Sequence, residues 1–324
     1  MNDTKVTVRP LEAGDLAEAD RIMRRAFGTF LGLPEPAAFM GDADYVRTRW
    51  AADPEAALAA EVDGRLAGTN FVTRWGSVGF FGPLTVDPDL WDRGVARALL
   101  AETMPLFERW GVTHAGLFTF PHSPKHLTLY QSFGFEPRFL TPVLTRDLSA
   151  GAGPGPAGAP RAGGRWGTVR DAADIGVIVA ACTRITDATY PGLDVTREIE
   201  ATTTQRLGDT VVVLDGDGNV EAFAVCHTGP GSEAGTGACF VKFGAALPGP
   251  GADVRFSRLL TACEAFAAEE RATTVVAGVN SARRPAHRAL LDRGYRPQMI
   301  GVTMHRPDES AYHDERAWVL DDWR

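Results

Sequence analysis

The segment LWDRGVARALL, residues 90–100, places two small residues, Gly94 and Ala96, at the start of an apolar helical pattern. Helix starts usually carry Ser, Thr, Asp or Asn, whose side chains cap the first free amides. Small residues followed at once by helix formers leave these backbone N–H groups bare for another group to approach. The residue types therefore indicate a binding site at this helix start, and the surrounding elements must identify its ligand.

The elements around this helix occur twice along the chain. Each half opens with a short alternating strand and a helix, and continues with two strands around an Asp-Gly turn, a hairpin signal. A further strand, a helix, a buried strand and a short helix that ends in Gly follow in both halves. Leu99 and Gly134 recur 160 residues later as Leu259 and Gly294. The sequence therefore predicts two copies of one α+β (mixed α/β) module.

A stretch of Ala, Gly and Pro separates the two copies and is typical of a linker, because it has nothing to bury and cannot propagate a helix. The terminal segment ERAWVLDDWR is amphipathic, and we expect it to dock on the body of the protein or, alternatively, to contribute to the acceptor pocket. The predicted organisation is a first module over 1–148, a linker over 149–167, a second module over 168–307 and a tail over 308–324.

Composition bounds the class of protein. The chain has 324 residues, 44% of them hydrophobic and 23% charged, which is ordinary for a soluble globular protein. A net charge of -8 with both signs mixed along the sequence argues against a nucleic-acid surface. The four cysteines form no metal-ligand spacing and are expected to be buried free thiols. We expect no metal site, no secretory leader and no membrane span, and therefore a cytoplasmic protein.

The order β-α-β-β-β-α-β-α-β, with the small-residue turn after the fourth strand, resembles the GNAT superfamily of acyl-CoA-dependent N-acyltransferases. The repeat is similar to the two-module members of that superfamily, of the mycothiol-synthase kind. The resemblance implies two tandem modules, each a mostly antiparallel central sheet flanked by helices. It also implies that the fourth and fifth strands splay apart, and that the thioester arm of acetyl-CoA lies in the gap.

The family's pyrophosphate motif, Q/R-x-x-G-x-G/A, falls on residues 91–96. Gly94 and Ala96 match it, whereas Trp91 stands where Gln or Arg is expected. The resemblance thus identifies the ligand of the bare amides as a pyrophosphate, held by hydrogen bonds and by the helix dipole. Arg93 and Arg97 would add positive charge, and Asp92 should point away from an anion.

The resemblance assigns further roles in the first module. Tyr130, four residues before Gly134, would lie near the CoA sulfur and protonate the departing thiolate. Ser123 stands where the family often has an Asn that contacts the pantetheine arm, and the backbone of the predicted fourth strand would pair with that arm. The expected catalytic residue is Tyr130, and the expected cofactor-binding residues are Leu84, Thr85, Val86, Trp91, Asp92, Arg93, Gly94, Val95, Ala96, Arg97 and Ser123.

The second copy departs from the motifs. At the same offset, Gly94 becomes Val254 and Ala96 becomes Phe256, which would crowd a phosphate off the helix start. Tyr130 becomes Leu290, which has no proton to give. We therefore expect a degenerate second module with a structural part, for example as one wall of the acceptor pocket.

Several other side chains are expected to be structural. His122 and His126 have the spacing of a metal pair, but Pro124 lies between them and no third ligand is near, so they are interpreted as solvated or substrate-facing. The remaining expectations are a strand-edge position for His114, a turn position for Asp87, a general-base part for Glu61 only if it faces the cleft, and core or acceptor-pocket positions for Trp75, Phe80 and Phe81.

These inferences converge on an N-acetyltransferase that moves an acetyl group from acetyl-CoA to a primary amine by direct attack. The acceptor, a small molecule or a peptide, is not identified by the sequence. Two alternatives stay open, namely a non-catalytic acyl-CoA-binding regulatory protein and an acyltransferase with a longer acyl donor. A monomer and a homodimer are both compatible with a tandem chain.

Overall fold

The computed structural model describes residues 5–148 and 165–324. Most of the linker predicted from composition, residues 149–164, lies outside the described residues. Trp166 and Gly167, which the composition places in that linker, begin a strand instead.

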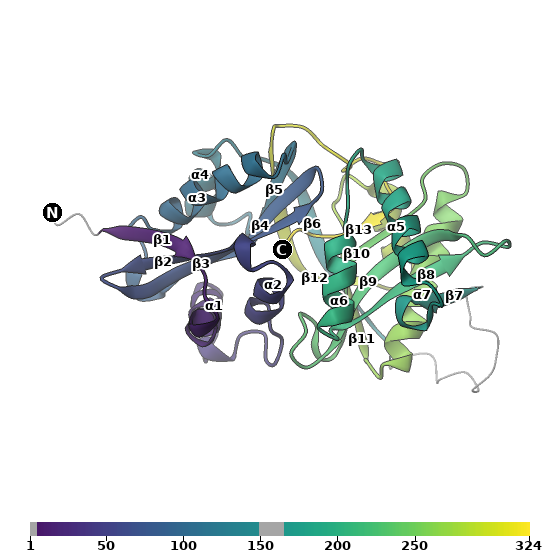
Figure 1. Ribbon diagram of the computed structural model, residues 1–324, viewed down its shortest axis with the longest axis horizontal. Helices are drawn as coiled ribbons and strands as arrows, with labels where there is room; N and C mark the ends of the chain where they lie inside the picture. Colours follow the sequence, from purple (N-terminus) through teal and green to yellow (C-terminus); the bar gives the residue numbers. More distant parts are fainter. Residues whose placement is uncertain (1–4, 149–164) are drawn as a thin grey trace.

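The first module has the predicted order of elements, with one further helix between the first two strands. Its strands are β1 (Val6–Pro10), β2 (Ala57–Val62), β3 (Arg65–Trp75), β4 (Val78–Val86), β5 (His114–Thr119) and β6 (Glu136–Asp147), and its helices are α1 (Leu16–Phe30), α2 (Val46–Ala52), α3 (Val95–Arg109) and α4 (Pro124–Gln131). In Figure 1, α3 and α4 lie above the sheet of this module and α1 and α2 lie below it.

The second module repeats this order. Its strands are β7 (Trp166–Thr168), β8 (Gly208–Leu214), β9 (Val220–Gly229), β10 (Gly235–Ala246), β11 (Thr274–Gly278) and β12 (Arg296–Arg306), and its helices are α5 (Ile175–Thr189), α6 (Thr196–Thr204), α7 (Ala252–Glu269) and α8 (Arg284–Asp292). A short strand in the tail, β13 (Val319–Leu320), pairs with β10. The offset of 160 residues holds in the sheet register, because Val78 faces His114 across β4 and β5 as Ala238 faces Thr274 across β10 and β11.

The two modules share one 13-stranded sheet. Twelve strands follow the order β1-β2-β3-β4-β5-β12-β6-β11-β10-β9-β8-β7, and the thirteenth, β13, pairs with β10 off this path. Each module gives its last strand to the other, since β12 lies between β5 and β6, and β6 lies between β12 and β11. Figure 1 shows the modules side by side with these strands between them. The mixed α/β tandem fold is thus as predicted, and the exchange of strands joins the two sheets into one.

The exchange makes the first module dependent on the second. Both neighbours of β6 are strands of the second module, and β12 covers the edge of β5. We expect residues 5–148 expressed alone to be insoluble or unfolded, because an apolar edge and an unpartnered strand would be exposed. Co-expression with residues 165–324 should restore a soluble complex, measured by gel filtration. A folded, monomeric 5–148 fragment would contradict this account.

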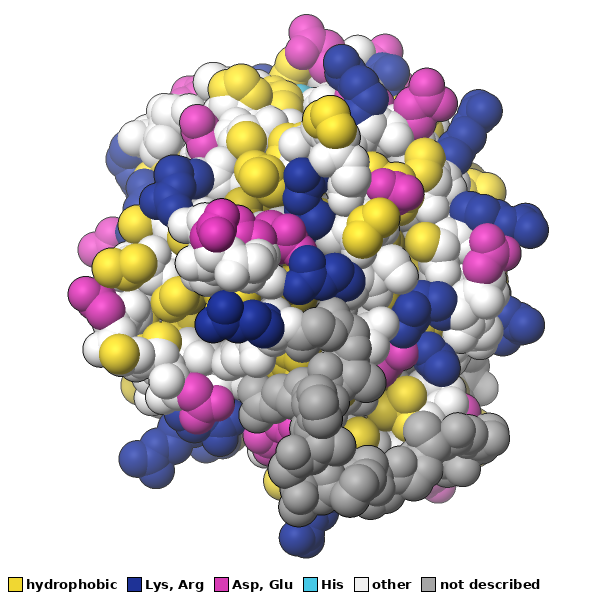
Figure 2. Space-filling model, turned by 90° about the vertical axis from the view of Figure 1, so that its right-hand side faces the viewer, with side chains coloured by type: hydrophobic (Ala, Val, Ile, Leu, Met, Phe, Trp, Pro, Cys, Tyr) yellow, Lys and Arg dark blue, Asp and Glu magenta, His cyan; other side chains and the backbone are white. Residues whose placement is uncertain are grey.

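Four buried clusters form the core. One lies under α3 and α4 in the first module, one lies between α1, α2 and the sheet, and one lies under α7 in the second module. The fourth joins Trp75, Val78 and Phe80 of the first module to α5, β9, β10 and the tail. Figure 2, which faces the second module, shows acidic and basic side chains interspersed among apolar ones on that face. Among the described helices, none has the length and apolar character to cross a membrane.

A group of buried histidines lies where the modules meet. The Nε2 atom of His114 on β5 lies 2.9 Å from the Nδ1 atom of His305 on β12, and the ring of His313 packs against that of His305. Burial lowers the pKa of His114 to about 4 and that of His305 to about 3. His114 is therefore a buried core residue, and the expected strand-edge position is wrong, because β12 covers that edge.

These shifts predict a loss of stability in mild acid. An unfolded histidine has a pKa near 6.5, so between pH 6.5 and about 4 the unfolded chain takes up protons that folded His114 does not. The free energy of unfolding therefore falls as the pH falls through this range. Urea unfolding midpoints should decrease from pH 7.5 to pH 5, and the decrease should be smaller in His305→Asn. A midpoint that stays flat over that range would contradict the prediction.

Candidate active site

The fourth and fifth strands of the first module, β4 and β5, are paired over part of their length and then separate. β4 and β5 are paired in parallel only from Val78 to Phe81, whereas β4 stays paired with β3 up to Val86. The Asp87 N–H donates to Ala67 O of β3, and alternate residues of an antiparallel strand donate to the same side. The amides of Leu84 and Val86 therefore face the gap, free to bind a ligand.

The start of α3 lies directly beyond that strand. Gly94 is the N-cap with φ 81°, in the left-handed region that favours glycine. The first helical hydrogen bond runs from Ala98 N–H to Gly94 O, so the amides of Val95, Ala96 and Arg97 precede it. A Cβ built on Gly94 meets nothing within 4 Å, so the space beside the N-cap is open. This geometry fits a pyrophosphate.

The side chains of the turn between β4 and α3 have roles that differ from those expected. The Trp91 indole N–H donates to Val86 O at 2.9 Å, and its main-chain N–H donates to Pro88 O at 3.4 Å. Since a Trp side chain has one donor, Trp91 braces the end of β4 and has no N–H left for a phosphate. Asp92 does turn to a cation, since its Oδ1 lies 2.6 Å from Lys125 Nζ. Lys125, at the start of α4, was missed by the sequence analysis.

The remaining basic residues of the motif lie at the surface. Arg93 and Arg97 are both exposed, and the Arg97 guanidinium lies 5.6 Å from the centre of the Phe133 ring. Lys125, also exposed, lies 5.9 Å above the Trp91 ring. Arg93 and Arg97 are thus exposed cations in and just after the turn, and Lys125 reaches the turn from α4 through its ion pair with Asp92. Only fold geometry brings Lys125 there, so no local sequence signal could have found it.

Tyr130 and Ser123 both belong to α4. Tyr130 is 7% exposed, its ring lies 5.7 Å from that of Phe81, the last residue of β4 paired with β5, and its hydroxyl bonds to Thr119. Burial raises the pKa of Tyr130 to about 12, so the phenol keeps its proton at neutral pH. The Ser123 hydroxyl accepts from the His126 N–H and so caps α4. The structure thus places Tyr130 at the point where the strands separate.

Aromatic side chains line the approach to Tyr130 from α1. The Phe30 ring lies 5.0 Å from Phe120 and 5.1 Å from His126, and His126 lies 6.4 Å from Tyr130. Burial lowers the pKa of His126. His122 stacks on Phe30 at 5.7 Å. These two histidines are therefore parts of an aromatic wall, to which the sequence analysis had not assigned Phe30 or Phe120.

The other acidic candidates are held by arginines. The carboxylate of Asp87 accepts from Arg25 at 3.0 and 3.1 Å and also caps the turn that follows β4. Glu61 on β2 accepts from Arg9 Nε at 2.8 Å. Both carboxylates are committed to ion pairs, so neither is placed as a general base.

The aromatic residues of β3 and β4 are core residues. Trp75 and Phe80 pack in the cluster shared with the second module, whereas Phe81 packs under α3 against Tyr130. All three are at most 2% exposed. They are core positions, and Phe81 alone contacts an expected site residue.

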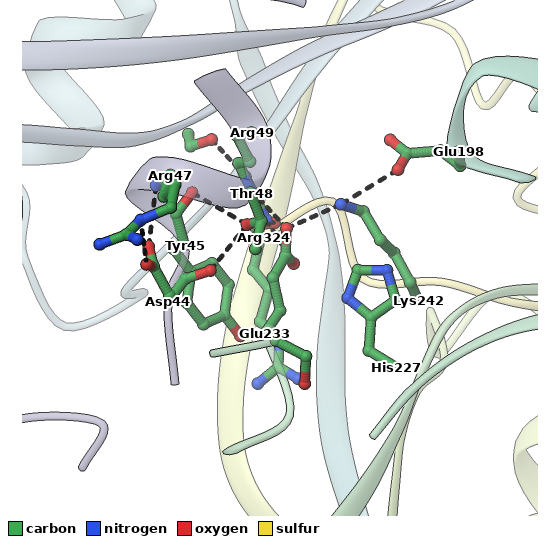
Figure 3. A network of polar contacts seen from close by, with 12 residues as sticks. Asp44, Tyr45, Arg47, Thr48, Arg49, Glu198, His227, Glu233, Lys242 and Arg324 are labelled. Atoms are coloured by element: carbon green, nitrogen blue, oxygen red, sulfur yellow. Dashed lines mark hydrogen bonds and ion pairs between the residues drawn. The ribbon is translucent and has the colours of Figure 1, made fainter. Parts of the chain in front are cut away.

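A buried arginine ties the separating strand to the second module. Arg49 on α2 donates to both carboxylate oxygens of Glu233, at 3.0 and 3.1 Å, and also to Gly82 O, just beyond the last residue of β4 paired with β5. A fourth bond, of 2.5 Å, runs to the main-chain oxygen of Arg324. Figure 3 shows Arg49 at the centre of this network. Arg49 therefore positions β4 relative to both the second module and the tail.

The network continues through Lys242 on β10. Its Nζ lies 2.7 Å from Glu233 and 3.1 Å from Glu198, and Glu198 also accepts from the Trp75 indole at 3.1 Å. Burial by itself would raise the pKa of Glu233, but the charges of Arg49 and Lys242 hold it well below its usual range. Glu233 is thus a permanent anion with two cationic partners, as a buried charge requires.

The second module differs at the equivalent helix start. α7 has 18 residues where α3 has 15, and the additional turn lies at its N-terminus, where Gly251 is the N-cap with φ 79°. Val254 lies within this turn and is 59% exposed, so the expectation that its side chain crowds a phosphate is wrong. Leu290, in the place of Tyr130, is fully buried.

The comparisons with known proteins agree with this geometry. Residues 22–135 match the model of the Acetyltransferase (GNAT) family. A putative acetyltransferase from Pyrococcus horikoshii has a similar fold, with a TM-score of 0.65 and 14% identity over 97% of this chain and 93% of that one. A GCN5-related N-acetyltransferase from Sphaerobacter thermophilus has a TM-score of 0.58 and 16% identity, over 93% of this chain and 95% of that one. Among curated proteins, none matches the sequence.

A two-module protein is among the similar structures. The tandem GNAT protein from the clavulanic acid biosynthesis pathway has a TM-score of 0.56 and 14% identity, over 93% of this chain and 98% of that one. Identities this low show the fold. Together with the family match over residues 22–135, they define the class: the first module carries a GNAT acetyltransferase domain, and the whole chain has the fold of two GNAT modules in tandem.

Proposed function

We propose that this protein transfers an acetyl group from acetyl-CoA to a primary amine, and that the first module alone binds the donor. One observation supports the proposal above the others: β4 is not paired with β5 beyond Phe81, and the buried Tyr130 packs against Phe81 at that point. The space beside Gly94, at the start of α3, is also open. A pyrophosphate, a pantetheine arm and a thioester sulfur would meet the amides of α3, the edge of β4 and the phenol in turn.

We assign a role in this reaction to the backbone amides of β4 and to the phenol of Tyr130. Acetyl-CoA, when bound, supplies a thioester carbonyl to a neutral amine. The amides of Leu84 and Val86 would pair with the donor and stabilise the negative charge that develops on the carbonyl oxygen. Tyr130, which burial keeps protonated, would give its proton to the sulfur as the C–S bond breaks, and the proton that the amine loses would pass through water and restore the phenol. Holding both reactants in line supplies much of the remaining rate.

A thiol-release assay tests the proposal while the acceptor is still unidentified. The protein is incubated with acetyl-CoA and a panel of amines that includes amino acids, polyamines, aminoglycosides and peptides, and free CoA is measured. Amine-dependent release supports the transferase. Binding of acetyl-CoA with no release for any amine would favour a regulatory acyl-CoA-binding protein, and release only from longer acyl-CoA thioesters would change the donor.

The proton donor gives a separate prediction for the amine that proves active. Tyr130→Phe keeps the ring and removes the hydroxyl, so kcat should fall by about 100-fold, the lower end of general-acid effects. The Kd of acetyl-CoA should hardly change. Tyr295→Phe in the second module is the matched control, because Tyr295 is also buried and lies away from the proposed path. An unchanged kcat in Tyr130→Phe would remove Tyr130 from the mechanism.

A further inference from the structure

The gap that is open in the first module is filled in the second. β10 and β11 are paired only from Ala238 to Val241 on β10, just as β4 and β5 separate after Phe81. Beyond this point the tail strand β13 pairs with β10, with Leu320 opposite Gly244 and Val319 opposite Ala245. The Ala246 N–H donates to Trp318 O at 3.0 Å. At the offset of 160 residues, Ala246 corresponds to Val86, whose amide faces the open gap.

A second equivalent position also contacts the tail. Arg283 precedes α8 as Ser123 precedes α4, and it is fully buried. Its guanidinium donates to Val319 O at 2.9 Å and to the Asp321 carboxylate at 2.5 Å. The residue in the place of an expected pantetheine contact therefore binds the main chain of the tail.

The tail also packs against α7, one turn after the start of that helix. The Trp318 ring lies 5.3 Å from that of Phe256, the residue in the place of Ala96. Val319 and Leu320 are fully buried. From Ala246 toward the point where β10 and β11 separate, residues 318–320 thus follow the course along β10 that the donor arm would follow along β4 in the first module.

Beyond this groove the tail reaches the first module. Asp322 packs so closely on Gly278, at the end of β11, that a Cβ on Gly278 would lie 2.3 Å from the Asp322 Cβ. The Trp323 ring fills the space over Gly116 of β5 in the same way. Arg324 then lies beside Arg49 (Figure 3). The tail is therefore a built-in part of both modules.

We propose that residues 318–322 permanently occupy the donor groove of the second module as an internal substitute for the pantetheine arm. This inference rests on the proposed function, which places the donor in the equivalent groove of the first module. It follows that the chain binds one molecule of acetyl-CoA and not two. The tail makes the main-chain hydrogen bonds that a donor would make, and its apolar side chains fill the groove.

Hydrogen exchange of the full chain, with and without saturating acetyl-CoA, tests the proposal. Without donor, the Ala246 amide should exchange on the order of 100-fold more slowly than the Val86 amide, because only the former is bonded across the gap. Acetyl-CoA should slow the exchange of the Val86 amide and leave the exchange rate of the Ala246 amide unchanged. Calorimetry on the same sample should give one acetyl-CoA per chain. Fast exchange at Ala246 that acetyl-CoA slows, or two equivalents bound, would overturn the proposal.

The outcome separates this inference from the proposed function. If acetyl-CoA slows neither amide, the first module is not a donor site and the proposed function fails, whereas slow exchange at Ala246 would still place the tail in the groove. Leu320→Glu, which puts a carboxylate in that groove, should speed the exchange of the Ala246 amide. Acetyl-CoA should still slow the exchange of the Val86 amide in this variant. Arg316→Ala, in the exposed part of the tail, is the control. Unchanged exchange at Ala246 in Leu320→Glu would contradict the proposal.

Discussion

Gly94→Glu should abolish the binding of acetyl-CoA at concentrations that saturate the wild type. The new carboxylate would lie over the amides of Val95 and Ala96, where the pyrophosphate is expected. At least two charge-assisted hydrogen bonds would be lost, each worth roughly 1.5–3 kcal/mol, so the Kd should rise by at least about 100-fold. Calorimetric titration of acetyl-CoA into both proteins measures this difference.

Two variants separate charge from backbone strain. A side chain at φ 81° costs roughly 1–2 kcal/mol in the left-handed region, and Gly94→Ala carries that cost without the carboxylate. Gly111→Glu adds the same carboxylate just beyond the other end of α3, at φ 66° and also in open space. Both controls should bind acetyl-CoA far better than Gly94→Glu.

The second module provides the decisive comparison. Gly251 is the N-cap of α7 and has nearly the same φ as Gly94. A Cβ built on Gly251 would lie 3.9 Å from the Arg255 guanidinium. Gly251→Glu should leave binding intact. If Gly251→Glu weakens binding and Gly94→Glu does not, then the donor site has been placed in the wrong module.

Much of this candidate site could be predicted from the sequence because the patterns that indicate it lie within short segments of the chain. The left-handed Gly94 and the following small residue lie within one turn of helix, and Tyr130 lies within five residues of Gly134, itself at φ 82°. Local patterns of this kind follow from short-range sterics. They survive in a single sequence even where, as with Trp91, the motif is incomplete.

The missed features depend on contacts between distant segments. Lys125 reaches Asp92 only because α4 folds back over the start of α3. The burial of His114 depends on β12, and alternation within His114–Thr119 cannot say which strand covers it. The tail pattern predicts docking but not its destination, since nothing in Val319–Leu320 specifies β10 as partner.

The largest expected loss of stability follows from Arg49→Met. Removing one partner of a buried ion pair costs about 3–5 kcal/mol, because the other charge is left without compensation. Glu233 is fully buried and would keep Lys242 as its second partner, so we expect about 3 kcal/mol. Gly82 O and Arg324 O would lose a donor as well. Urea unfolding of the full chain, followed by circular dichroism, gives the value.

Arg47→Met is the matched control for this prediction. Arg47 lies on the same helix, two residues earlier, and its side chain is 76% exposed while it pairs with Asp44 at 3.3 Å. Exposed pairs contribute about 0–1 kcal/mol, so this variant should unfold nearly as the wild type does. A loss in Arg49→Met no greater than in Arg47→Met would show that the buried network does not hold the modules together.

The double variant Arg49→Met, Glu233→Gln tests the cause of the loss. If an uncompensated Glu233 carboxylate dominates, its neutralisation should recover part of the stability, and the two substitutions should be strongly non-additive. If the loss comes from the freed carbonyls of Gly82 and Arg324, the double variant should be no more stable than Arg49→Met. In that case Arg49 would act mainly as a clamp on the separating strand, and acetyl-CoA binding should weaken in both variants.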